Sequence, residues 1–110
     1  MTPEVEVRFG FAGGWAQAHG ATVACDDPVR AIALALRRGG ASGGPGRPTH
    51  AAVVPAGTPQ VESPPCPELD WRKPGCRRAE ITAYDSLGHH YVRRSLADCV
   101  PAGTQIVRLP

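Results

Sequence analysis

Hydrophobic and polar residues alternate in the stretch EVEVRFGF at residues 4–11. A period of two is typical of a strand that turns one face toward a core. The predicted inward set is Val5, Val7, Phe9 and Phe11. A shorter apolar run, ATVAC at residues 21–25, is predicted to pair back against this strand, with GGWAQAHG between them as a wide connection.

The segment DDPVRAIALALRRGG predicts the single helix, over about residues 27–38. Asp27 can accept hydrogen bonds from the first unpaired amide groups, and Pro28 suits the first helical position. Gly39 supplies the left-handed residue that ends many helices. Spacing at i, i+3, i+4 and i+7 predicts a buried stripe. Its members are Val29, Ile32, Ala33 and Leu36.

Further strands are predicted on both sides of a long proline-rich stretch. They cover residues 49–54 (THAAVV), 78–86 (RAEITAYDS), the run from His89 (HHYVRRSLA) and 104–109 (TQIVRL). A turn at residues 85–88 predicts a hairpin, and the last three strands are expected to form a meander. Two connections interrupt this pattern, a flexible loop at about residues 39–48 and a proline-rich loop at about 62–77.

These elements predict one small α+β domain over residues 1–110. A mostly antiparallel sheet of about five or six strands would pack with the single helix, joined by long loops rich in glycine and proline. The hairpin followed by a packing helix resembles the order of elements in β-grasp proteins, without any shared motif. A chain of 110 residues can bury one modest core.

The string V-P-A-G-T occurs twice, at residues 54–58 and 100–104. Val-Pro-Ala-Gly suits a type I turn with proline second and glycine fourth, so each copy is predicted to join two strands. Reuse of one turn and decayed duplication of a β-unit both explain the identity. Reuse is the favoured interpretation, because the similarity ends close to the shared string and true repeats usually come in threes or more.

Charge and composition narrow the classes of function only slightly. The formal net charge of +2 is too small to indicate a polyanionic partner by itself. Eleven arginines against one lysine, with 13 glycines and 12 prolines, suggest a GC-rich genome and an accessory protein of a bacterium or phage. The sequence has neither a signal peptide pattern nor an apolar run long enough for a membrane span, so a cytoplasmic protein with reduced thiols is predicted.

The cysteines give little support for a metal site. Zinc sites usually present ligands as C-x₂₋₄-C, a spacing that this chain lacks. A site assembled from Cys66, Cys76, His89 and His90 remains a weak alternative, although successive strand residues point to opposite faces. Cys25 and Cys99 are expected to be small buried hydrophobic residues. No cofactor and no catalytic residue are predicted, although the bases around Cys76 would favour its thiolate form.

A basic segment, WRKPGCRR at residues 71–78, combines an aromatic ring with several bases and no acid. Arginine with an aromatic residue can contact phosphates and stack a nucleobase. The candidate nucleic-acid-binding residues are Trp71, Arg72, Lys73, Arg77, Arg78, Arg93 and Arg94. The acids Glu62, Glu68 and Asp70 lie just upstream, so a solvated loop explains the same segment.

The sequence therefore predicts a small non-enzymatic binding or accessory protein that acts through a macromolecular partner. Another protein is the first choice, bound through a sheet edge or through the proline-rich loop. Nucleic acid bound by the basic segment is the second choice, and a metal- or cysteine-dependent protein or enzyme is the third. Self-association is compatible with each of these.

Overall fold

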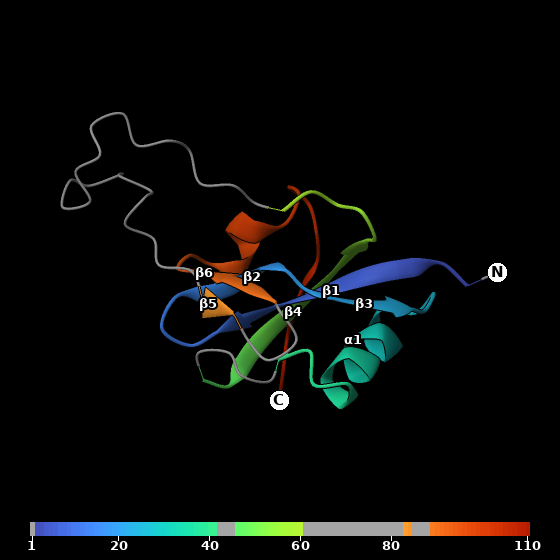
Figure 1. Cartoon of the computed structure of the whole chain (residues 1–110), viewed down its shortest axis with the longest axis horizontal. Coiled ribbons are helices and arrows are strands. Elements are labelled where there is room, and N and C mark those ends of the chain that lie inside the picture. Colours follow the sequence, from blue (N-terminus) through green and yellow to red (C-terminus); the bar gives the residue numbers. More distant parts are fainter. Residues whose placement is uncertain (1, 42–45, 61–82, 85–88) are drawn as a thin grey trace.

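The computed structural model describes residues 2–41, 46–60, 83–84 and 89–110. Several predicted features lie outside these residues, namely the proline-rich loop 62–77, most of the strand 78–86, the turn 85–88 and part of the loop 39–48. Within the described residues the chain forms one antiparallel sheet and one α-helix, as the sequence predicts (Figure 1).

Strand β1 (Glu4–Phe11) runs through the middle of the sheet. Strand β4 (Pro48–Pro55) pairs with it along one side, and β3 (Ala21–Ala24) and β2 (Trp15–His19) share the other side. The remaining strands extend the sheet, with β6 (His90–Val92) on β2, β5 (Ala83–Tyr84) on β6 and β7 (Ile106–Arg108) on β4.

Strand β2 corrects the sequence prediction, which treated residues 13–20 as a connection. The stretch WAQAH lacks β-branched residues, so its strand propensity is low. Pairing on both sides, with β1 and with β6, overrides that low propensity. Local composition therefore hid a strand that tertiary contacts define.

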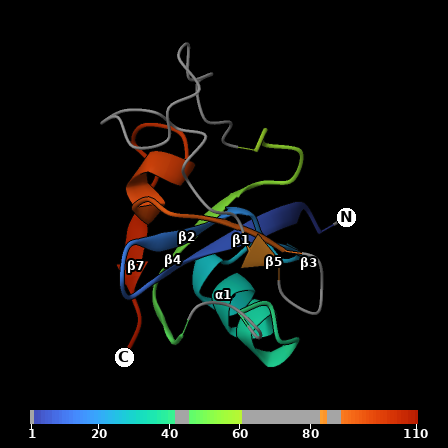
Figure 2. The same cartoon turned by 60° about the vertical axis from the view of Figure 1, so that its left-hand side comes forward.

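Strand β1 is buried on both faces rather than on one. Helix α1 (Pro28–Arg37) covers the face that carries Val7 and Phe9, as predicted. The other face is covered by the short 3₁₀ helix η2 (Leu96–Cys99), on the side of the sheet opposite to α1 (Figure 2). Helix η2 packs on Ala16, Ala18 and Ala52. The polar residues of β1 therefore lie in a second core, with Glu6 2% and Arg8 0% exposed.

Helix α1 begins and ends where the sequence predicts, but of the predicted buried stripe only Ile32 is buried. Asp27 accepts a hydrogen bond from the amide of Val29, and Gly39 has a φ of 78°. The buried residues are Ala31, Ile32 and Ala35. Small alanines let the helix approach the sheet closely, whereas the predicted stripe placed Val29, Ala33 and Leu36 in the core. All three are exposed.

Among helices in the described ranges, none is long and apolar enough to cross a bilayer.

The predicted three-stranded meander does not form. Residues 83–84 do pair with β6, as the hairpin prediction requires. After β6, however, η2 crosses one face of the sheet, and β7 pairs with β4 at the opposite edge. A crossing of this kind leaves no local signal, because it depends on which strand edge remains open after β1 and β4 have paired.

The two V-P-A-G-T copies form the same turn. In each copy the Thr amide donates to the Pro carbonyl at 3.1 Å, in Thr58 with Pro55 and in Thr104 with Pro101. Each Thr hydroxyl donates to the same carbonyl, at 2.6 Å and 2.7 Å. The glycines have φ values of 87° and 86°, so glycine stands third, as in a type II turn, and the predicted type I register was wrong.

Both copies therefore form the same turn, as the interpretation of turn reuse requires. Duplication of a β-unit stays a prediction. The surroundings of the two copies differ. The first copy follows strand β4, whereas the second follows η2 rather than a strand, which corrects the expectation of a strand before each turn.

Candidate functional site

An irregularity in the pairing of β1 creates the polar centre of the molecule. Val7 pairs with Ala21 and Gly10 with Ala16, so only residues 8 and 9 of β1 face residues 17–20 of the neighbouring strands. The two extra residues form a bulge, which leaves backbone donors without ladder partners. Gly20 allows this close packing, because a Cβ there would lie 1.9 Å from the carbonyl oxygen of Val7.

Two buried side chains replace the missing ladder bonds. Gln17 accepts from the amide of Phe9 at 2.7 Å, and Glu6 accepts from the amide of Gly20 at 2.9 Å. The side-chain Nε2 of Gln17 also donates to the Gly40 carbonyl at 2.7 Å, and it lies 3.2 Å from the hydroxyl of Tyr91. Gln17 thus connects the bulge to the segment that follows α1.

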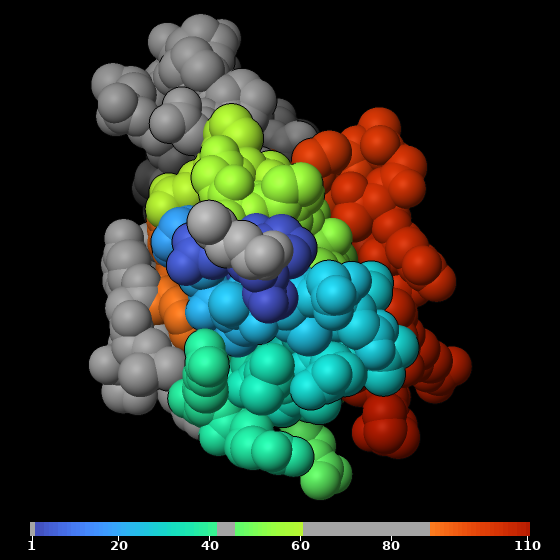
Figure 3. All heavy atoms as spheres, turned by 90° about the vertical axis from the view of Figure 1, so that its right-hand side faces the viewer, coloured from blue at the N-terminus to red at the C-terminus, as the bar shows by residue number. Residues whose placement is uncertain are grey.

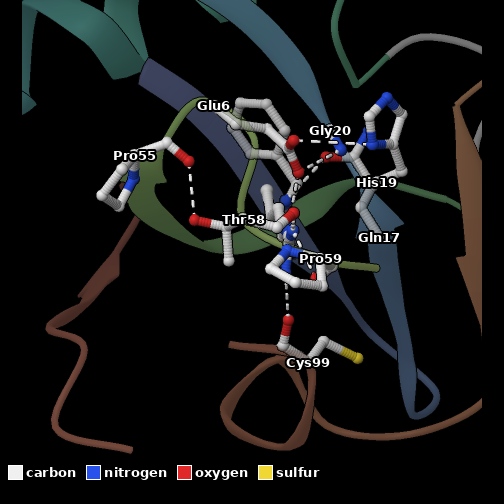
Figure 4. A network of polar contacts seen from close by, with 10 residues as sticks. Glu6, Gln17, His19, Gly20, Pro55, Thr58, Pro59 and Cys99 are labelled. Carbon is white, nitrogen blue, oxygen red and sulfur yellow. Dashed lines mark hydrogen bonds and ion pairs between the residues drawn. The ribbon is translucent and has the colours of Figure 1, made fainter. Parts of the chain in front are cut away.

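Arg8 lies at the centre of a second group of buried contacts. Its Nε donates to Glu6 at 2.5 Å, and Nη1 donates to the carbonyl of Cys99 at 2.6 Å. Its Nη2 lies 3.0 Å and 3.2 Å from the carbonyl oxygens of Thr58 and Pro59 (Figure 4). All three guanidinium nitrogens therefore have acceptors within the protein, as a buried cation requires.

Two histidines, His19 and His90, lie near this network on strands β2 and β6. Nδ1 of His19 lies 3.5 Å from the carboxylate of Glu6, and His19 stands opposite His90 in the β2–β6 register. Burial and the nearby His19 lower the pKa of His90. Within the described ranges, no group of three or more His, Cys, Asp or Glu side chains could hold a metal ion.

Two of the four cysteines lie within the described residues and two lie outside them. Cys25 and Cys99 are buried, as the sequence predicts. Cys66 and Cys76 lie outside the described residues, so the weak metal alternative that also used His89 and His90 stays a prediction.

An open pocket of about 320 Å³ lies on the η2 face of the sheet. It is bounded by the β1–β2 turn, the start of β4, η2 and β7. Gly13 and Gly14, with φ values of 84° and 81°, form the turn that presents the half-buried Trp15. The apolar lining comes from Phe11, Trp15, Leu96, Ala97 and Ile106.

Polar side chains also line this pocket. Thr49 and His50 line it from β4, with the Thr49 hydroxyl 2.9 Å from His50 Nδ1 and 3.3 Å from the Gly10 carbonyl. Ser95 lines it from the start of η2 and donates to Asp98 at 2.8 Å. No described lining residue is an acid, so the pocket itself carries no negative charge.

Arg93 lies at the pocket through its contact with Trp15. Its guanidinium carbon is 5.8 Å from the centroid of the Trp15 ring, within the range of a cation–π interaction. On the β7 side, Arg108 stands opposite His50 in the β4–β7 register. The pocket therefore has a mostly apolar lining and arginines nearby on two sides.

The predicted basic site is only partly represented. Trp71, Arg72, Lys73, Arg77 and Arg78 lie outside the described residues. Arg93 is exposed beside the pocket, whereas Arg94 is half-buried and its amide donates to the Val92 carbonyl at 3.0 Å.

Sequence reasoning missed Trp15 and His50. The signal that would have found Trp15 is the pairing of Ala16 with Val92, which brings Trp15 next to Arg93. That pairing follows only once β2 is recognised as a strand.

Comparison with known proteins adds no relative. No protein-family model, no curated protein and no solved structure matches the chain. The resemblance to the β-grasp order of elements therefore stays a prediction.

Proposed function

We propose that this chain is a non-enzymatic binding protein that takes up an extended segment of a protein partner. The segment adds as a strand beside β7 and places one apolar side chain in the pocket. One observation supports this most directly: Ile106 belongs both to the pocket lining and to β7, the last strand of the sheet among the described residues. A strand edge and a side-chain socket are thus adjacent.

The register of β7 fixes which of its backbone groups face outward. The amide of Leu109 donates to the Thr49 carbonyl at 2.9 Å, and Val107 stands opposite Ala51. Because hydrogen-bonding direction alternates along an antiparallel strand, Ile106 and Arg108 direct their backbone groups away from β4. An added strand would gain affinity from these groups, as in β-strand addition.

The pocket would supply selectivity. Its volume of about 320 Å³ is at the lower end for ligand pockets, roughly 300–1,000 Å³, and suits one large apolar side chain better than a cofactor. Trp15 and Leu96 offer apolar contacts, while Arg93 favours a carboxylate next to the anchoring residue. The preferred segment is therefore extended, with an apolar anchor and a neighbouring acid.

A displayed library of random heptapeptides tests the proposal. We expect enrichment of peptides with one aromatic or large aliphatic residue beside Asp or Glu. Arg108→Pro removes an outward amide without touching the bonds to β4, so it should weaken an enriched peptide at least about tenfold. Arg108→Ala is the matched control for loss of the side chain, and Trp15→Ala tests the pocket.

Two results would refute this function. One is a library that yields no binder; the other is binding that neither Arg108→Pro nor Trp15→Ala weakens. Circular dichroism of each variant separates loss of binding from loss of fold.

Nucleic acid is the second candidate, and the contact between Arg93 and Trp15 favours it. An aromatic ring beside a guanidinium can stack a base and hold its phosphate. Oligothymidylate binding should then fall steeply with added salt and disappear in Trp15→Ala. Absence of binding at low salt would exclude this candidate.

A further inference from the structure

Helix α1 has an apolar side that the sheet does not use. The side chains of Val29 and Leu36 are 71% and 41% exposed, and they are the exposed large hydrophobic residues of the described ranges. With Ala33 they occupy positions i, i+4 and i+7, so they lie on one stripe of the helix. Ala31, Ile32 and Ala35 are buried on the other side.

Arginines border this outward stripe. At 3.6 residues per turn, Leu36, Val29, Ala33, Arg37 and Arg30 follow one another around the helix. An open hollow of about 200 Å³ is lined by Arg30, Ala33, Leu34 and Arg37. We call the surface formed by Val29, Arg30, Ala33, Leu36 and Arg37 the outer face of α1.

The charge on the outer face has one sign. The helix sequence PVRAIALALR contains no acid. The nearest acids, Asp26 and Asp27, precede the helix, and Asp27 accepts a hydrogen bond from the Val29 amide. Guanidinium groups at i and i+7, with apolar side chains beside them, therefore complement a surface that carries carboxylates and apolar groups together.

We propose that the outer face of α1 docks an acidic amphipathic helix of a partner protein. Its apolar side chains would contact Val29, Ala33 and Leu36, and its carboxylates would bind Arg30 and Arg37. A helix is the fitting occupant, because rows at i±4 on one helix pack into the grooves of another. A second copy fits poorly, since an antiparallel pair would set Arg30 against Arg37 of the other copy.

This surface is independent of the pocket. Helix α1 covers one face of the sheet, and the pocket lies on the opposite face with η2. Figure 3 shows the helix, in cyan to teal, forming part of the open surface of the molecule. The inference therefore stands or fails separately from the proposed strand addition.

Two synthetic helical peptides test the inference on the full chain. Both carry leucines at i, i+3, i+4 and i+7; one has glutamates flanking them and the other has lysines. Titration calorimetry should show binding of the acidic peptide, with the basic peptide at least about tenfold weaker. The double variant Arg30→Glu with Arg37→Glu should reverse this preference.

Further variants separate apolar from charged contributions. Val29→Ser with Leu36→Ser should weaken the acidic peptide at least about tenfold. Arg47→Glu, an exposed arginine outside the helix, is the control and should leave the affinity within about twofold after correction for net charge. The replaced side chains are exposed, so melting curves should stay close to that of the unaltered chain.

Three results would overturn the inference. The first is failure of the acidic peptide to bind, or equal binding of both peptides. The second is a charge-reversed variant that still prefers the acidic peptide. The third is a dimer in sedimentation that dissociates in the Val29→Ser, Leu36→Ser variant, because the occupant would then be a second copy.

Discussion

Arg8 donates through Nη1 to the carbonyl oxygen of Cys99, which joins residues 91 positions apart in the chain. The same guanidinium contacts the carbonyl of Thr58, the last residue of the first V-P-A-G-T copy. Cys99 directly precedes the second copy. One buried cation on the central strand therefore contacts the end of the first turn and the residue that precedes the second copy.

Replacing Arg8 by methionine tests the importance of this tie. Glu6 would keep a buried charge without its partner, a change that typically costs about 3–5 kcal/mol. We expect the free energy of unfolding in urea to fall by that amount. The double variant Glu6→Gln with Arg8→Met removes both charges and should recover part of the loss; equal losses in the single and double variants would contradict the ion-pair explanation.

Gly20→Ala should be among the most damaging single changes to the fold. A Cβ would lie 1.9 Å from the Val7 carbonyl oxygen, so the bulge would have to open. We expect a loss of at least about 3 kcal/mol, the upper end for overpacking. Gly14→Ala is the matched control, because open space surrounds that position and only its φ of 81° is unfavourable. A loss of about 1–2 kcal/mol is expected there.

The two V-P-A-G-T turns should respond alike to the same substitution. Gly57→Ala and Gly103→Ala each force alanine into a left-handed conformation, at a cost of about 1–2 kcal/mol. Thr58→Val and Thr104→Val each remove one hydroxyl bond, worth about 0.5–1.5 kcal/mol. Thermal or urea unfolding measures both pairs. A difference above about 1 kcal/mol between matched variants would mean that the two turns contribute differently to the free energy of unfolding.

Stability should fall as the pH decreases through the ordinary histidine range. Burial and the nearby His19 lower the pKa of His90 from 6.5, so the unfolded chain binds this proton first. The loss begins as pH falls through about 6.5 and is complete below the pKa of His90 in the folded state. Urea unfolding at several pH values measures it, and His90→Gln should reduce the slope.

A separate experiment tests the cause of this shift. His19→Gln removes one of its two causes, so the pKa of His90 should rise while staying below 6.5 because burial remains. Proton resonances of the His90 ring, followed through a pH titration, report the value directly. An unchanged pKa would show that His19 has no influence, and Glu6, close to His19, is the first group to examine in that case.

Local patterns predicted much of the fold. Alternation predicted β1, and Asp27, Pro28 and Gly39 predicted the bounds of α1 because each acts on its own backbone. Strand β2 and the order of strands in the sheet were not predicted, because both depend on pairing between distant segments. The exposure of Val29 and Leu36 was not predicted for another reason. Apolar residues lie all around this helix, so spacing alone does not select a face, and close packing on the sheet favoured Ala31 and Ala35.

The candidate site was much less predictable than the fold. The sequence suggested arginines beside an aromatic ring, but it grouped Arg93 with the segment 71–78 and did not consider Trp15. The contact with Trp15 depends on the β2–β6 pairing. Burial of Glu6 and Arg8 likewise required knowledge of what covers the second face of β1, which the alternation of β1 does not contain.

The distance in sequence between Arg8 and its acceptors also bears on how the chain folds. Strands β1, β2 and β3 adjoin in sequence and can associate early, whereas the Thr58 and Cys99 carbonyls arrive only after long loops close. We therefore expect Arg8 to lose its hydration late in folding. We expect the Arg8→Met variant to unfold faster while folding at nearly the original rate, which places this contact on the native side of the folding barrier.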